Sequence, residues 1–363
     1  MTQAVALAQQ ASTGVSQGFK NRIINGAMVI DQRNAGASVT PTASTYLVDR
    51  FQTVFGGSTP SKLSFQQTTT APTSFSNSLK ITSTSAYSLA SGDFFQLEQS
   101  IEGYNTSDLG YGSANAKTVT LSFWVQSSLT GTFGMFLANG ANTRLYPATY
   151  TVNSANTWEQ KTITLNGDTS GTWNTTNTTG LRVVWTLGYG SNYTSGTAGA
   201  WATANGSNFI PSGCTSLVGT SGATFYITGV QLEVGSTATS FDYLDYGRSL
   251  IQCQRYFWRM NGRSSGGNAT FAAGQVYNST DVRAVLTNPV PMRADTSITF
   301  TGTNFAYSNA GSVKTLGTPL AADQTTQTAL LYSGAGTTSA TQGQAAFWVI
   351  TNTDSFISVS AEL

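Results

Sequence analysis

Histidine is absent from this chain of 363 residues, and its only cysteines are Cys214 and Cys253. Without histidine, Ser-His-Asp and Cys-His nucleophile systems are excluded, as is every metal site that needs a histidine ligand. Two cysteines are too few for a structural zinc site or for the disulfide framework of a small secreted domain. The sequence is therefore compatible with folding in a reducing compartment, and we expect Cys253, in an apolar run, to be a small buried residue.

Charge is also scarce. Charged residues make up 9% of the chain and the formal net charge is +1, whereas ordinary domains are about 25% charged. Such a surface produces little long-range field, so we expect neither nucleic acid nor an anionic membrane as a partner. No run of 18 apolar residues is present, which excludes a spanning helix. Because no basic segment precedes the first apolar residues, we expect no cleaved signal peptide.

Apolar residues amount to 39% of the chain and aromatic residues to 11%, and both recur in short runs separated by Gly, Asn and Ser. Such runs predict an all-β fold, namely a jelly-roll β-sandwich followed by a smaller C-terminal β domain. In the first domain the expected strands are Ile23–Ile30, Tyr46–Phe55, Leu63–Gln67, Leu79–Ser83, Phe94–Ile101, Val119–Ser127, Phe133–Leu137, Arg144–Val152, Trp158–Leu165, Leu181–Leu187 and Phe225–Val234. In the second they are Gly274–Tyr277, Asp281–Leu286, Ser297–Phe300, Thr328–Tyr332, Ala345–Ile350 and Ser355–Glu362.

The stretch from Gly222 to Phe257 marks the boundary between these domains. Ala223–Val234 alternates apolar and polar residues, which predicts a half-buried strand with a bulge at Gly229. In Tyr246–Arg259 the apolar residues recur at three and four positions, which predicts a short helix. The expected layout is an N-terminal attachment segment over 1–20, a jelly roll over 21–245, a helical joint over 246–262 and a C-terminal β domain over 263–363.

The N-terminal residues 1–18 contain the Ala-rich run Ala4–Ala11, which favours a helix. An isolated helix of this length is marginal in water, so it needs copies of itself or a larger assembly as a partner. A frayed terminus is the alternative.

Several phrases of the sequence stand out, namely NRIINGAMVIDQRNAG, YLVDRF, TVTLSFWVQSS, TYTVNSANTWEQKTITLNGDTSGTW and FYITGVQLEVGSTATSFDYLDYGRSLIQCQRYF, followed by NPVPMRADTSITFTG and the terminal Ser-Ala-Glu-Leu. In this order they resemble the jelly-roll modules, and the C-terminal module after them, of bacteriophage tail fibres and other virion appendage proteins. The resemblance covers about residues 21–300 and the last few. It implies a virion protein, assembled in the host cytoplasm and held by other virion proteins through its N-terminus.

More distantly, the expected opening strand, LSFWV and FYITGVQLE resemble the carbohydrate-binding jelly rolls attached to glycoside hydrolases. Those modules often hold a structural calcium with an acidic residue in the last strand, and Gly229 stands at that place here. We expect no cofactor and no metal, and keep a carboxylate cluster that binds calcium as an alternative.

Paired carboxylates are the enzymatic option that remains, because two acids about 5–10 Å apart can hydrolyse a glycoside. The candidate pairs are Asp93 with Glu98, Glu98 with Glu102, and Asp242 with Asp245. Scattered acids form such neighbours by chance, and acids such as Asp31 and Asp49 are expected to pair with arginine or to cap turns. We therefore expect no enzymatic activity.

Aromatic residues in loops of low charge offer a different chemistry. A flat indole or phenol ring can stack on a sugar, while Asn, Ser and Thr side chains bind its hydroxyl groups. The candidate glycan-binding residues are Trp173, Tyr189, Tyr193 and Trp201, the last three within the long polar segment 188–222. The alternative is that these rings cover loops or fill a subunit interface.

Four apolar residues near the boundary, Leu250, Ile251, Phe257 and Trp258, are expected at a domain or oligomer interface, and we expect a homotrimer. Together these observations predict a trimeric phage tail fibre or similar appendage that recognises host surface polysaccharide. A purely structural head fibre, decoration or tail component is the alternative, and a glycan-degrading enzyme is a weaker one.

Overall fold

The computed structural model describes residues 19–57, 61–262, 269–278, 281–309, 312–315, 321–335, 341–351 and 355–363. The helix expected over residues 1–18 lies outside them. The chain divides after Asp245 into two compact units, here called unit 1, up to Asp245, and unit 2, Tyr246–Leu363.

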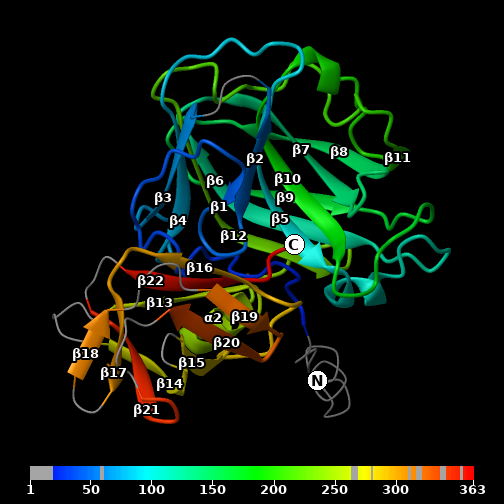
Figure 1. The fold of residues 1–363 in the computed structure, drawn as a ribbon. Coiled ribbons are helices and arrows are strands. Elements are labelled where there is room, and N and C mark those ends of the chain that lie inside the picture. The colour runs from blue at the N-terminus through cyan, green and yellow to red at the C-terminus, as the bar shows by residue number, and fades with distance from the viewer. Residues whose placement is uncertain are drawn as a thin grey trace, which may run out of the picture. The chain divides into compact units, whose positions relative to one another are not determined.

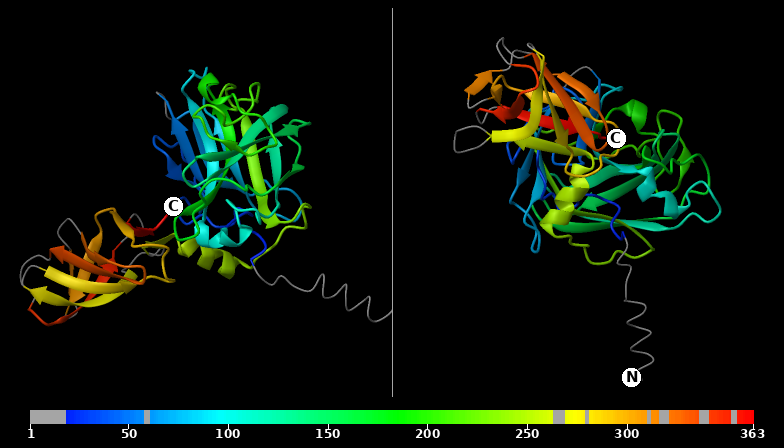
Figure 2. Two further views of the ribbon diagram at one scale, coloured as in Figure 1. Left: turned by 90° about the vertical axis from the view of Figure 1, so that its right-hand side faces the viewer. Right: turned by 60° about the horizontal axis from the view of Figure 1, so that its bottom comes forward.

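Unit 1 is a β-sandwich of the jelly-roll kind, with two antiparallel sheets stacked face to face (Figures 1 and 2). The larger sheet has seven strands in the order β1-β2-β5-β10-β7-β8-β11. These are β1 (Thr45–Tyr46), β2 (Gln52–Gly56), β5 (Phe94–Glu102), β10 (Thr179–Tyr189), β7 (Gly131–Asn139), β8 (Arg144–Val152) and β11 (Ala202–Thr203). The smaller sheet has the order β3-β4-β12-β6-β9, with β3 (Leu63–Thr68), β4 (Ser78–Ser83), β12 (Thr224–Val234), β6 (Val119–Ser127) and β9 (Glu159–Leu165).

Alternating residues from both sheets form the core of this sandwich. Phe123 of β6 and Trp185 of β10 come from opposite sheets, are fully buried, and meet edge to face with their ring centroids 5.6 Å apart. Since successive side chains of a strand point to opposite faces, the alternation seen in the sequence places these rings between the sheets. The expected all-β sandwich is confirmed.

The strand expected over Ile23–Ile30 is wrong, because Ile24–Ala27 form a turn and Met28–Ile30 have no regular secondary structure. Asn25 and Met28 have φ angles of 59° and 58°, which a strand does not allow. The Asn25 side chain bonds both the N–H and the C=O of Ile30, at 3.0 and 2.9 Å, so it replaces the ladder that a strand would supply. Four apolar residues of the segment are nevertheless buried, namely Ile23, Ile24, Met28 and Ile30, which explains its apolar character.

The bulge expected at Gly229 is confirmed. The register of β12 against β6 shifts between Thr228 and Gln231, and Gly229 has a φ angle of 60°. A Cβ atom at this position would lie 2.6 Å from the ring of Phe75 and 2.9 Å from that of Trp124. Glycine is therefore required both by the backbone conformation and by the close approach of the two rings.

Unit 2 begins with the helix α2 (Tyr246–Gln254) and then changes to strand. The helical joint expected over 246–262 is correct only for its first half, because residues Phe257–Asn261 form β13 and pair with β22 (Phe356–Ser360). The remaining strands are β14 (Ala269–Asn278), β15 (Asp281–Thr287), β16 (Ser297–Thr301), β17 (Phe305–Asn309), β18 (Ser312–Thr315), β19 (Ala321–Thr325), β20 (Ala329–Ala335) and β21 (Ala345–Ile350). They form sheets of the orders β13-β22-β16 and β18-β17-β21-β14-β15-β20-β19.

Within the described ranges of the chain, no helix is long and apolar enough to cross a membrane.

Candidate functional site

The seven-stranded sheet of unit 1 has one face toward the core and one face away from it, here called the outer face. On β10, Trp185 points into the core, whereas Val184 belongs to a separate apolar cluster with Phe136 of β7 and Ile210. Glu98 of β5 pairs with Val184 across the ladder and shares its face. The outer face therefore carries polar and apolar side chains side by side.

A network of polar side chains runs along the outer face of β2, β5 and β10. Glu98 is 1% exposed and forms an ion pair with Arg182. Its carboxylate also accepts hydrogen bonds from Gln52 Nε2 at 2.6 Å and from Gln96 Nε2 at 2.5 Å. Because a buried carboxylate needs hydrogen-bond partners, the network is a fixed structure rather than a set of mobile surface groups. Tyr189 extends it by donating its hydroxyl proton to Gln96 Oε1.

The long segment between β10 and β12, residues 190–223, folds back over the outer face. It forms the short 3-10 helix Ser191–Tyr193 and the edge strand β11, which pairs with β8. Ile210, 2% exposed, packs into the apolar cluster on the outer face, and its N–H bonds the carbonyl oxygen of Tyr193 at 3.3 Å. Thr215 N–H bonds Thr132 O of β7 at 2.7 Å, which fixes the end of the segment on the sheet.

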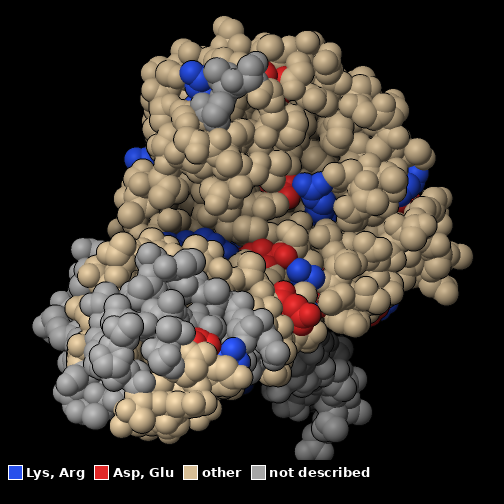
Figure 3. All heavy atoms as spheres, in the orientation of Figure 1, with Lys and Arg blue, Asp and Glu red and all other residues tan. Residues whose placement is uncertain are grey.

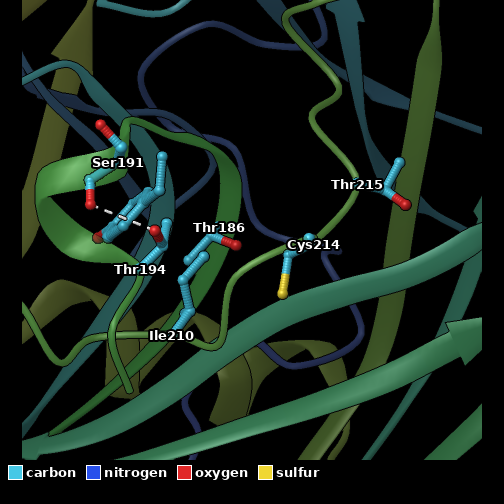
Figure 4. A pocket seen from close by; sticks show the side chains of 8 residues that line it. Thr186, Ser191, Thr194, Ile210, Cys214 and Thr215 are labelled. Atoms are coloured by element: carbon cyan, nitrogen blue, oxygen red, sulfur yellow. Dashed lines mark hydrogen bonds between the residues drawn. The ribbon is translucent and has the colours of Figure 1, made fainter. Parts of the chain in front are cut away.

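A cavity of about 230 Å³ lies between this segment and the sheet. In Figure 4, Thr186, Ser191, Thr194 and Ile210 gather on one side of it, and Cys214 and Thr215 lie on the other. Its lining among the described residues contains hydroxyl groups, a thiol and an isoleucine, but no charged side chain: Thr186, Tyr189, Ser191, Thr194, Ile210, Gly213, Cys214 and Thr215. Figure 3 shows the same scarcity of charge over the surface turned to the viewer, where blue and red atoms are few and scattered.

Several polar side chains of the cavity wall donate hydrogen bonds to the backbone. Thr186 Oγ1 donates to Gly134 O at 2.8 Å, and Thr194 Oγ1 donates to Ser191 O at 3.3 Å. Cys214 Sγ donates to Pro211 O at 3.3 Å. Burial raises the pKa of the Cys214 thiol and raises that of the Tyr189 phenol well above its usual value, so both groups are neutral near pH 7.

The predicted residues Tyr189 and Tyr193 belong to one aromatic cluster beside the cavity. Their ring centroids are 5.8 Å apart, and both rings contact Phe94 and Phe209 at 5.6–6.3 Å. Both side chains are half-buried, and Tyr193 OH donates to Gly92 O at 3.3 Å. Of the two, only Tyr189 lines the cavity.

The predicted residues Trp173 and Trp201 lie together in a second cluster. Their rings meet at right angles with centroids 5.3 Å apart, and Tyr111 packs against both, at 4.8 and 5.8 Å. The indole N–H groups bond Ser170 O at 3.0 Å and Asn166 O at 2.7 Å, respectively. These rings hold loops together and are half-buried against the core.

The predicted interface residues separate into two kinds. Phe257 and Trp258 are 5% and 4% exposed; Trp258 belongs to the core of unit 2, and its Nε1 donates to Asn288 Oδ1 at 3.1 Å. Leu250 is half-buried and Ile251 is 54% exposed. Of these four residues, therefore, only Ile251 is exposed.

Two acids of the candidate carboxylate pairs, Glu98 and Asp93, are engaged in structural contacts. Glu98 is bound by Arg182, and Asp93 accepts hydrogen bonds from Tyr87 OH at 2.7 Å and from Ala90 N–H at 2.8 Å. Of the acids expected in other roles, Asp49 pairs with Arg33 at 2.7 Å, and Asp31 caps the turn at residues 34–36. Within the described part of the chain, no group of three or more acidic or cysteine side chains is placed to hold a metal ion.

Sequence reasoning missed most of the cavity residues. It singled out Tyr189 but not Thr186, Ser191, Thr194, Cys214 or Thr215, because isolated hydroxyl residues in a Ser/Thr-rich loop carry no pattern of their own. The one available signal was the length of the loop, since a connection this long in a compact domain is usually functional or disordered.

No family model matches the chain, and no curated protein sequence matches it. Among solved structures, it is similar to the enzymatically active domain of tailspike protein 4 of bacteriophage CBA120, with a TM-score of 0.29 and 10% identity over 59% of this chain and 21% of that one. A family 11 carbohydrate-binding module of Clostridium thermocellum, solved with a mixed-linked tetrasaccharide, has a TM-score of 0.29 and 12% identity over 55% of this chain and 100% of that one. A putative sugar-binding protein of Bacteroides thetaiotaomicron has a TM-score of 0.33 and 10% identity over 60% of this chain and 100% of that one. Likeness at this level transfers none of their activities to this chain.

Proposed function

We propose that unit 1 binds a neutral glycan at the cavity on the outer face of the seven-stranded sheet. The observation that carries this proposal is the lining itself, which combines hydroxyl groups with an aromatic ring and contains no charged side chain among the described residues. A sugar residue has the matching chemistry, with hydroxyl groups around a ring and no charge. An anionic ligand would lose its hydration there without gaining a counter-charge.

The setting proposed for this binding is a bacteriophage virion, in which the chain acts as a tail fibre or similar appendage that recognises host surface polysaccharide. The supporting observation is the ordered series of sequence phrases that resemble such appendages, from residue 21 to about residue 300. In this proposal the chain forms a homotrimer, and the Ala-rich N-terminal segment attaches it to other virion proteins. The exposed Ile251 supplies one apolar contact for a neighbouring copy.

The chain is proposed to bind rather than to cleave glycans, because Glu98 and Asp93 of the candidate acid pairs are held in structural hydrogen bonds. A purely structural appendage without receptor binding is the second candidate. It is favoured by the packing of the four predicted aromatic residues, because their rings contact one another in two clusters within unit 1.

An array of neutral and anionic glycans, probed with the labelled full-length chain, tests the proposal. Ser191 is exposed and lines the cavity, so a tryptophan at this position blocks it. Thr197 is exposed in the same loop but does not line the cavity, and Thr197→Trp is the matched control. We expect Ser191→Trp to lower the signal of neutral glycans at least tenfold and Thr197→Trp to leave it unchanged.

The absence of binding to any neutral glycan would overturn the proposal in favour of the structural alternative. Release of reducing sugar from a bound polysaccharide would instead identify an enzyme. Electron microscopy of virions labelled with an antibody to the chain tests the proposed location.

A further inference from the structure

We propose that the cavity admits one sugar residue whose hydroxyl groups are unsubstituted, and that O-acetylation or O-methylation of this residue prevents its binding. This inference rests on the proposed function and specifies the ligand of the same site. It follows from the size of the cavity and from the direction of the hydrogen bonds in its wall.

The volume of about 230 Å³ limits the part of a ligand that the walls of the cavity can enclose. A single water needs only about 10–15 Å³ of such space, whereas pockets for drug-sized ligands begin at about 300 Å³. The cavity therefore has room for one small ring compound and not for an oligosaccharide. A longer glycan has to place a single residue in it and run outward from there.

The wall has already used most of its hydrogen-bond donors. A threonine or tyrosine hydroxyl carries one proton and two acceptor sites, and a thiol carries one weak donor. Thr186, Thr194, Tyr189 and Cys214 each direct that single proton to an oxygen of the protein. What these groups can offer to a ligand is a lone pair.

A ligand that binds such a wall must itself donate hydrogen bonds. A free sugar hydroxyl does so, whereas the same oxygen as a methyl ether or an acetate ester has no proton to give and carries additional bulk. Ser191 Oγ and Thr215 Oγ1 have no hydrogen-bond partner in the described part of the protein, so they remain able to donate to the ring or glycosidic oxygen. Each donor removed from the ligand should weaken binding about 2- to 12-fold.

Cys214 makes the occupancy of the cavity measurable. The chain has only two cysteines, of which Cys253 is fully buried and Cys214 is partly exposed at the cavity. A neutral methanethiosulfonate reagent added to the native full-length chain at mildly alkaline pH should therefore modify Cys214 alone. Because burial raises the pKa of this thiol, the reaction is slow and its protection is easily timed.

The experiment measures this modification rate in the presence of saturating methyl glycosides of glucose, galactose, mannose and N-acetylglucosamine, and of the residue best bound on the glycan array. We expect at least one free glycoside to slow the reaction fivefold or more, and its fully O-methylated and O-acetylated forms to give no protection at equal concentration. Cys214→Ser should abolish the reaction, and Thr197→Trp should leave both the rate and its protection unchanged.

Equal protection by the free and the O-methylated sugar would overturn the inference. If a glycan binds on the array and Cys214 reacts at its unliganded rate, the cavity is not the binding site; the inference then fails while glycan binding by the chain stands. If no glycan binds at all, the proposed function fails and the inference fails with it.

Discussion

Replacement of Trp201 by alanine should destabilise unit 1 by about 2–4 kcal/mol, although the residue lies in a polar surface loop. Truncation of a fully buried tryptophan costs about 3–5 kcal/mol, and each aromatic pair adds about 0.5–1.5 kcal/mol. Trp201 is half-buried, contacts Tyr111, Tyr146 and Trp173 at 5.3–5.8 Å, and donates to Asn166 O at 2.7 Å. Because Trp201 is only partly buried, truncation should cost less than that of a fully buried tryptophan. The loss of its ring contacts and of its hydrogen bond adds to this smaller cost.

Urea denaturation of the full-length chain measures this loss. Since two units are present, a single two-state transition cannot be assumed, and hydrogen exchange of peptides within residues 19–245 should be used to assign the transition to unit 1. Trp201→Phe keeps a ring but loses the indole N–H, and should cost about 1 kcal/mol or more. Tyr104→Ala, at a residue 59% exposed, is the control and should change stability by less than about 0.5 kcal/mol.

A Trp201→Ala variant as stable as the Tyr104→Ala control would refute this reasoning. The ring would then be free at the surface. If glycan binding were lost in the same variant, the stacking role first suggested by the sequence would replace the packing role given to it here.

Three further perturbations test other parts of the fold. Burial acts to raise the pKa of Glu159, yet hydrogen bonds from Lys161, Ser154 and Asn153 lower it to about 2. The ionised Glu159 carboxylate therefore stabilises the fold above an unfolded-state pKa of about 4.3, and this stabilisation is lost as the pH falls toward 2. Glu159→Gln should flatten the dependence of melting temperature on pH in that window, and an unchanged slope would contradict the assignment. Gly229→Ala should lower the melting temperature of unit 1 by several degrees, because the new Cβ atom would meet Phe75 and Trp124 at a positive φ angle; a neutral effect would mean that both rings move freely. Deletion of residues 1–18 should leave the β-rich circular dichroism and the melting temperature unchanged while abolishing incorporation into virions, whereas loss of the fold would contradict a role in attachment alone.

The β-sandwich was predictable from the sequence because its signal is local. Alternation over Val119–Ser127 and Phe225–Val234 gave strands that the structure contains, and the break in alternation at Gly229 gave the bulge. The apolar run Ile23–Ile30 also predicted a strand, but there Asn25 adopts a left-handed conformation and binds Ile30 through its side chain. Burial and backbone conformation are separate properties, and an apolar run reports only the first.

The candidate site was less predictable because it depends on contacts between distant parts of the chain. Whether Trp201 is exposed depends on Tyr111 and Tyr146, which belong to other loops and strands. The cavity forms only when the segment after β10 returns to β7 through the bond from Thr215 to Thr132. Phe257 and Trp258 continued an apolar helical spacing, yet pairing with β22 makes them a strand. No local pattern encodes these long-range contacts.

The central claim is that unit 1 binds a neutral glycan through uncharged groups. Calorimetric titration of the full-length chain with the glycan best bound on the array, between about 0.05 M and about 0.5 M sodium chloride, tests it most directly. Because no charged side chain lines the described cavity, the account predicts that the dissociation constant changes by less than about twofold over this range. Binding confined to anionic polysaccharides, with affinity falling tenfold or more as salt is added, would contradict it.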